Sequence, residues 1–152
     1  MSVALRACAL ALILSLLPGC GEDKAVGPKP AEITGLWSAT KDEYVSKSNP
    51  ALSVNRIAPD SIATCAINSD KSYVFILRRA GHAPDTTDGT WRLDGDQFMV
   101  NPYDRPQTTW VWDASLTSNT LTLTGADVWY DFNGDAQYQV EEEADNNMVL
   151  VR

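Results

Sequence analysis

Three groups of residues in this sequence have types and spacings that could do chemistry: a cysteine, a run of carboxylates and amides, and a set of aromatic rings. Cys20 closes the short sequence Leu17-Pro18-Gly19-Cys20 directly after an apolar run. The chain has a single histidine, His82, and no serine or cysteine in a nucleophile-elbow sequence. Since it also lacks a histidine–cysteine cluster that could ligate zinc, the sequence predicts a protein that is not an enzyme.

A segment rich in oxygen ligands lies near the C-terminus, where Asp131, Asn133 and Asp135 alternate with other residues. Calcium takes carboxylate and carbonyl oxygens, so these three residues are weak candidates for a Ca²⁺ site. An EF-hand loop needs glycine at its sixth position, but Ala136 stands there. The alternative is a hairpin turn at Asn133 and Gly134, a pair typical of type I′ turns. We therefore expect no obligatory cofactor.

Aromatic residues form the largest candidate group, and most of them fall on the apolar faces of segments with β character. The candidates to line a ligand cavity are Trp37, Tyr73, Phe75, Trp91, Phe98, Trp110, Trp112, Trp129 and Tyr138. Rings of this size either fill the interior of a small barrel or surround one small ligand. A packed core is an equal alternative, because the domain has no internal disulfide to stabilise it.

The N-terminal segment has the pattern of an export signal. An apolar run over residues 7–17 follows Arg6, and it is shorter than the roughly 20 residues that a membrane-spanning helix needs. Its length fits the apolar part of a secretory signal, so we expect residues 1–19 to be removed. Residues 20–32 are polar and rich in Gly and Pro, which predicts a flexible tether before a single domain at 33–152.

The sequence Leu17-Pro18-Gly19-Cys20 resembles the lipobox of bacterial lipoproteins. In that family the cysteine receives a diacylglycerol, the signal is removed, and the new amine is acylated, typically with palmitate. The resemblance implies that Cys20 anchors the protein to the membrane of the cell envelope. Gly21, where some lipoproteins have aspartate, implies the outer membrane, with the domain facing the periplasm or the cell exterior. The alternative is an ordinary signal peptide with a coincidental cysteine.

The charge balance excludes one class of partner and suggests another. The chain has a formal net charge of −8 at pH 7, which opposes nucleic-acid binding. Residues 107–151 contain no Lys or Arg, and the expected C-terminal hairpin carries Glu141, Glu142 and Glu143. This acidic hairpin is either a solubilising face or a docking site for a protein partner with a basic surface.

From residue 33 onward the pattern indicates β-strands, because β-branched and aromatic runs alternate with turn residues and no helical period is sustained. Strands are expected at residues 34–41, 61–67, 73–77, 90–93, 97–100, 109–116, 121–124, 128–130, 136–140 and 148–151. We expect a bulge at Gly125 and count eight or nine short antiparallel strands in sequence order. Turns are expected at Asp94-Gly95, Asn133-Gly134 and residues 145–147, and loops at residues 46–60 and around Asp88-Gly89.

Eight or nine sequential strands predict an all-β, single antiparallel meander that closes into a barrel of about eight strands, because closure hides the sheet edges. A two-sheet β-sandwich is the alternative. Gly35-Leu36-Trp37, the long loop after the first strand, and residues 89–96 and 116–123 resemble the small bacterial lipocalin-like lipoproteins.

The lipocalin-like resemblance implies a structural role for two residues and a function for the barrel. Trp37 would pack across the closed barrel end, with Arg152 as a possible partner. Because the usual C-terminal helix does not follow Arg152, a reduced form of the fold is expected. The implied function is binding of a small apolar or amphipathic ligand. The alternative is a non-catalytic interaction module, such as an inhibitor or envelope assembly factor, with a filled barrel core.

Overall fold

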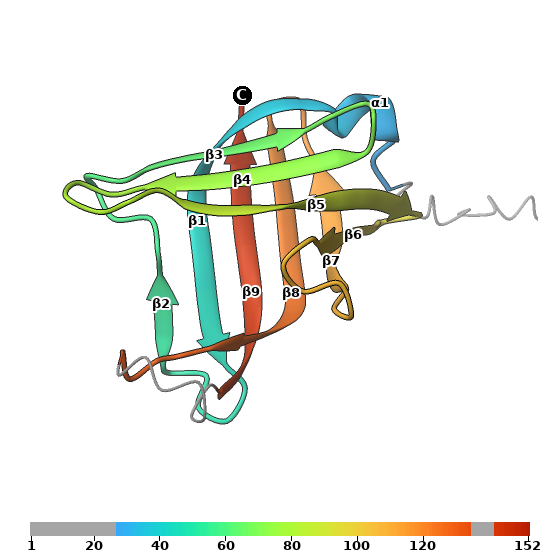
Figure 1. Ribbon diagram of the computed structural model, residues 1–152. Coiled ribbons are helices and arrows are strands. Elements are labelled where there is room, and N and C mark those ends of the chain that lie inside the picture. The colour runs from blue at the N-terminus through green and yellow to red at the C-terminus, as the bar shows by residue number, and fades with distance from the viewer. Residues whose placement is uncertain (1–26, 135–141) are drawn as a thin grey trace, which may run out of the picture.

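The computed structural model describes residues 27–134 and 142–152, and most of them belong to one antiparallel sheet (Figure 1). One short helix, α1 (Pro30–Ile33), precedes the strands. The strands are β1 (Gly35–Ser46), β2 (Ser53–Asn55), β3 (Ile62–Ile67), β4 (Ser72–Arg78), β5 (Asp85–Asp94), β6 (Gln97–Pro102), β7 (Trp110–Leu116), β8 (Thr120–Tyr130) and β9 (Glu142–Val151). Across these two ranges, no helix is long and apolar enough to cross a bilayer. The expected signal, Cys20 and Tyr138 lie outside the described residues.

The sheet closes on itself, which confirms the predicted antiparallel barrel. Each strand from β3 to β9 pairs with the next in sequence, and β9 pairs with β1 to complete eight strands. The remaining strand, β2, pairs with β1 through three residues at Glu43, Tyr44 and Val45. In Figure 1, β3, β4 and β5 run across β1, β9 and β8 at a steep angle, so the two groups of strands face each other over the interior.

Alternation along the strands places the apolar side chains inside the barrel. In β4, Tyr73, Phe75 and Leu77 are buried, while the residues between them are more exposed. The same period in β7 buries Trp112 and Ala114, as the sequence predicts. Burial of each such side chain contributes about 1.5–3 kcal/mol, and this core stabilises the fold without an internal disulfide.

One end of the barrel is sealed by α1, Trp37 and Arg152. The Trp37 indole Nε1 donates to the Ile33 carbonyl oxygen at 2.8 Å, which fixes the ring beneath α1. The Arg152 guanidinium lies 4.4 Å from the centroid of the Trp37 ring and donates to the Glu32 carbonyl oxygen at 2.9 Å. The expected contact between Trp37 and Arg152 is therefore confirmed. The first three residues of the helix belong to the predicted tether, so regular structure begins earlier than expected.

The predicted turn at Asp94-Gly95 and the predicted bulge at Gly125 are confirmed. Asp94 pairs with Gln97 across a tight hairpin in which Gly95 has a φ of +62°, a conformation that favours glycine. Gly125 has a φ of +82° and lies at the register shift between Leu123 and Ala126, so β8 contains the expected bulge.

Three sequence predictions about loops and turns are wrong. The predicted turn at residues 145–147 is strand, because β9 runs unbroken and pairs with both β1 and β8. Asp88 and Gly89 lie inside β5, which starts at Asp85, and not in a loop. The predicted loop at residues 46–60 includes β2. In each case strand pairing outweighed a local preference for turns.

Candidate functional site

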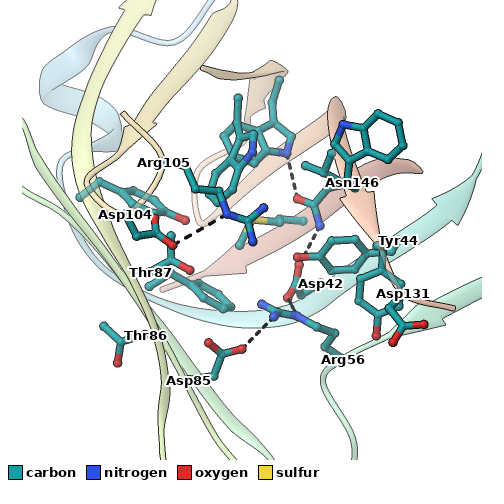
Figure 2. Close-up of a pocket in the computed structure, with 18 residues that line it drawn as sticks. Asp42, Tyr44, Arg56, Asp85, Thr86, Thr87, Asp104, Arg105, Asp131 and Asn146 are labelled. Atoms are coloured by element: carbon teal, nitrogen blue, oxygen red, sulfur yellow. Dashed lines mark hydrogen bonds and ion pairs between the residues drawn. The ribbon is translucent and has the colours of Figure 1, made fainter. Parts of the chain in front are cut away.

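The end of the barrel opposite α1 contains a cavity of about 300 Å³, which we call the mouth cavity (Figure 2). Its walls come from six strands: the last part of β1, the first parts of β4, β5 and β7, the end of β8 and the middle of β9. The loop between β2 and β3 adds Arg56, and the loop between β6 and β7 adds Asp104 and Arg105. The volume lies at the lower end of the range for small-molecule pockets, about 300–1,000 Å³.

A chain of hydrogen bonds crosses the buried wall of the mouth cavity. The Trp112 indole Nε1 donates to Asn146 Oδ1 at 3.0 Å, and Asn146 Nδ2 donates to Asp42 Oδ1 at 2.8 Å. Asp42 and Asn146 are almost fully buried, and no buried side-chain polar atom in the described residues lacks a partner. The wall is therefore polar but satisfied, which holds the Trp112 ring in one orientation.

Arg56 enters the mouth cavity from its loop and joins this chain. Its Nε donates to Asp42 Oδ2 at 2.7 Å, and its Nη1 donates to Asp85 Oδ2 at 2.9 Å. Its guanidinium lies 5.2 Å from the Tyr44 ring centroid and 5.9 Å from that of Phe75. Figure 2 shows the guanidinium between the two carboxylates. The loop thus presents a cation that two carboxylates and two aromatic faces hold.

Stacked aromatic rings form the wall between β1 and β8. The Tyr44 and Tyr130 ring centroids are 4.3 Å apart with the planes inclined by 29°. Burial and the Asp42 carboxylate raise the pKa of Tyr44 well above its usual value, so the phenol is neutral at physiological pH. On β7, the strand next to β8, Trp110 and Trp112 meet edge to face at 6.1 Å. These faces give the mouth cavity apolar surface beside its charged groups.

The structure divides the nine predicted aromatic residues between two environments. Those that line the mouth cavity are Tyr73, Phe75, Trp110, Trp112 and Trp129. Trp37, Trp91 and Phe98 are buried in the packed core nearer the closed end. Tyr138 lies outside the described residues. Both alternatives hold in part, because the barrel is filled towards α1 and hollow at the other end.

Sequence reasoning missed the polar residues of the mouth cavity, of which Asp42, Arg56 and Asn146 are central. A register shift between Ala39 and Lys41 changes which residues of β1 face inward, and this brings Asp42 inside. Arg56 lies in a loop, where strand alternation says nothing. The position of Asn146 could have been predicted, because it lies two residues before Met148 and alternate residues of a strand face the same side.

The weak calcium candidates show the geometry of a turn. Asp131 Oδ1 accepts the backbone N–H groups of Asn133 at 3.0 Å and Gly134 at 2.8 Å, as in an Asx turn. Asp135 lies outside the described residues. Among residues 27–134 and 142–152, no group of three His, Cys, Asp or Glu side chains could hold a metal ion.

Several acids near the predicted acidic hairpin have partners within the chain. Lys47 pairs with Asp127 and lies 3.6 Å from an oxygen of Asp145. Glu142 accepts hydrogen bonds from the Ser46 and Ser48 hydroxyl groups at 3.1 and 3.2 Å. These contacts tie the loop after β1 to the strands that border the mouth cavity.

Comparisons with known proteins add no family assignment. No protein-family model matches this chain, and a search of curated proteins found no match to it. The case for a function therefore depends on the sequence motifs and on the geometry of the mouth cavity.

Proposed function

We propose that this protein is a lipid-anchored lipoprotein of the cell envelope whose lipocalin-like barrel binds a small apolar or amphipathic molecule in the mouth cavity. One observation carries the binding proposal: a cavity of about 300 Å³ combines aromatic faces with charged and polar side chains. Ligand sites in proteins commonly have this composition, in which apolar walls provide affinity and polar groups fix orientation.

The division of the interior supports a ligand of limited size. The core around Trp37, Trp91 and Phe98 is packed, so a ligand reaches no deeper than the level of Trp112 and Met148. The buried wall is already hydrogen-bonded, and a ligand therefore does not have to satisfy it. A ligand with an apolar body and one polar end at the rim fits this arrangement best.

The anchoring part of the proposal is supported by the sequence. The apolar run at residues 7–17, the lipobox-like sequence ending at Cys20, and the polar residues after it follow the order found in lipoproteins. We also propose that the protein is not an enzyme, since its single histidine, His82, is exposed and lies outside the mouth cavity.

Native mass spectrometry of the full-length protein, released from native membrane vesicles, tests the binding proposal. We expect an additional mass of a small molecule on the wild-type chain. Thr87→Trp should abolish that mass, because Thr87 lines the mouth cavity and the larger ring would fill it. Thr90→Trp is the matched control, since Thr90 is an exposed residue of the same strand, outside the cavity lining.

Two results would contradict the binding proposal. One is a wild-type chain that carries no additional mass and binds no added amphipath, in which case the interaction-module alternative leads. The other is an additional mass that Thr87→Trp and Thr90→Trp affect equally. Circular dichroism of both variants shows whether the barrel is intact.

A further inference from the structure

The mouth cavity has an excess of negative charge. Among the residues that the structure describes, its lining includes two arginines, no lysine or histidine, and four aspartates: Asp42, Asp85, Asp104 and Asp131. The whole chain has the same sign of charge, at −8. A cleft with low-dielectric walls focuses such a field, so the potential at the mouth cavity favours cations over anions.

The two arginines do not cancel this excess of negative charge, and carboxylates already hold the more buried of them, Arg56. Arg56 donates to Asp42 and to Asp85, as described above. Arg105 Nε lies 3.9 Å from an oxygen of its neighbour Asp104. An anionic ligand would have to compete with Asp42 and Asp85 for the Arg56 guanidinium, so Arg56 is a poor receptor for a phosphate or carboxylate group. The contact of Arg105 with Asp104 is exposed and weaker, so Arg105 does not oppose an anion in this way.

Arg56 also demonstrates the chemistry that the mouth cavity accepts. A delocalised cation lies against the faces of Tyr44 and Phe75, with a carboxylate on each side. Other ring faces in the lining belong to Trp110, Trp129 and Tyr130. The Asp85 carboxylate is 41% exposed, so it can meet a second cation that enters from solvent.

We infer that the mouth cavity selects a positively charged amphipathic molecule, with an ammonium or guanidinium group near Asp85 and an apolar body against the tryptophans. This inference rests on the proposed binding function and specifies its ligand class. It excludes fatty acids and other anionic amphipaths as the preferred ligands.

Three probes of matched size and different charge test the inference: 4-phenylbutylammonium, 4-phenylbutanol and 4-phenylbutyrate. Each is titrated into the full-length protein in phosphatidylcholine vesicles, with tryptophan fluorescence as the readout, because Trp110, Trp112 and Trp129 line the mouth cavity. Vesicles that carry Thr87→Trp correct for partitioning of the probes into lipid. We expect the ammonium to bind at least about tenfold more tightly than the carboxylate, with the alcohol between them.

Asp85→Asn should weaken binding of the ammonium probe by about three- to tenfold and leave the alcohol unchanged. Asp88→Asn is the matched control, because Asp88 is exposed on the same strand and lies outside the cavity lining. Asp88→Asn removes one negative charge, as Asp85→Asn does. Any effect that the two variants share therefore comes from the net charge of the protein and not from a contact at Asp85.

The outcomes separate the inference from the binding proposal. Equal affinity for all three probes, or tighter binding of the carboxylate, overturns charge selection while binding in the mouth cavity stands. Equal weakening by Asp85→Asn and Asp88→Asn also overturns it. If none of the probes binds, and Thr87→Trp has no effect on fluorescence titrations, the binding proposal fails and the inference fails with it.

Discussion

Asp42 connects the barrel wall to the loop that carries Arg56. Its two carboxylate oxygens accept hydrogen bonds from Asn146 Nδ2 and Arg56 Nε, and its side chain is 2% exposed. The Asp42 carbonyl oxygen also accepts the backbone N–H of Arg56 at 2.9 Å. Loss of this one carboxylate would leave a guanidinium and an amide with unmet donors in a buried place.

We therefore predict that Asp42→Leu lowers the free energy of unfolding by about 3 kcal/mol, because breaking a buried ion pair leaves its partner uncompensated. Asp85→Asn is the comparison, and it should cost less than about 1 kcal/mol because Asp85 is partly exposed. Urea unfolding of both variants, followed by tryptophan fluorescence, measures the two losses. Equal losses of unfolding free energy in the two variants would contradict the prediction that burial makes the Asp42 ion pair more important for stability.

Cys65 gives the protein a predictable response to alkaline pH. Complete burial raises the pKa of its thiol to about 12 from a usual value of 9.0, against a smaller opposing effect of a hydrogen bond with Tyr73. Below pH 9 the thiol is neutral in both the folded and unfolded states, so its contribution to stability is constant. Between pH 9 and 12 only the unfolded state ionises, and stability falls by about 1.4 kcal/mol per pH unit.

The measurement compares urea unfolding of the wild type and of Cys65→Ala at pH 8 and pH 10.5. We expect the wild type to lose about 2 kcal/mol more than the variant over this interval. Tyr44 and Tyr73 are present in both proteins, and burial is the largest cause that raises the pKa of each, so the difference comes mainly from Cys65 and its contact with Tyr73. A difference near zero would contradict burial of a neutral thiol.

At this scale the sequence predicts apolar positions well and buried polar ones poorly. The inward aromatic residues of β4 and β7 follow from alternation, which needs only a local period of two. Asp42 is invisible to that reasoning, since the irregularity near residue 40 reverses the facing of β1. Arg56 depends on contacts between a loop and three strands, which no local pattern encodes.

Among the elements, the pairing of β5 with β6 depends on one close approach. Gly89 faces Pro102, and a side-chain carbon added at Gly89 would lie 2.3 Å from the Asn101 carbonyl oxygen. Since that oxygen belongs to the backbone of a neighbouring strand, it cannot move aside without displacing β6. In the sequence, Asp88-Gly89 is typical of a loop, but the glycine is needed here because it packs against the backbone of β6.

We predict that Gly89→Ala lowers the free energy of unfolding by about 3 kcal/mol, because the two strands must separate. Gly81→Ala is the control: Gly81 has a φ of +74° and open space around it, so the change should cost about 1 kcal/mol through backbone strain alone. Thermal and urea unfolding of both variants test this order. If Gly81→Ala proves the more damaging change, the close approach is not a constraint.

Turn chemistry predicted the hairpin between β5 and β6, but strand pairing decided the structure elsewhere. Asp94-Gly95 was identified because a type I′ turn needs residues that tolerate positive φ. The asparagines at 146 and 147 gave the same kind of signal, yet they lie in β9 with neighbours on both sides. A strand that is paired on both edges gains enough hydrogen bonds to override a preference for turns.

At the scale of the whole molecule, closure of the barrel was predictable because an antiparallel meander of this length has no other simple way to hide its edges. The sealed end was predictable only through the resemblance that pairs Trp37 with Arg152. The mouth cavity was not, since a filled and a partly hollow barrel share the same alternation. Its volume depends on the packing of side chains from six strands.

The anchoring proposal predicts the fate of the whole chain in the cell. Cys20→Ser should move the protein from the membrane fraction to the soluble fraction and abolish incorporation of labelled palmitate, because the thiol that receives the lipid is gone. Cys8→Ser is the matched control, which removes a thiol from the expected signal and should leave the protein in the membrane fraction. Retention of Cys20→Ser in the membrane would refute lipid attachment at this residue.

The sealed base of the barrel has a consequence for the route by which a guest molecule arrives. Gly27 packs against the backbone of Gly95 and Asp96, at the same end as α1 and Arg152. An acylated Cys20 is seven residues away, a reach of at most about 25 Å. Under the anchoring proposal, the lipid would therefore attach the protein near its sealed base, at the end of the barrel away from the mouth cavity. We would then expect a ligand to reach the mouth cavity through the aqueous compartment and not directly from the bilayer.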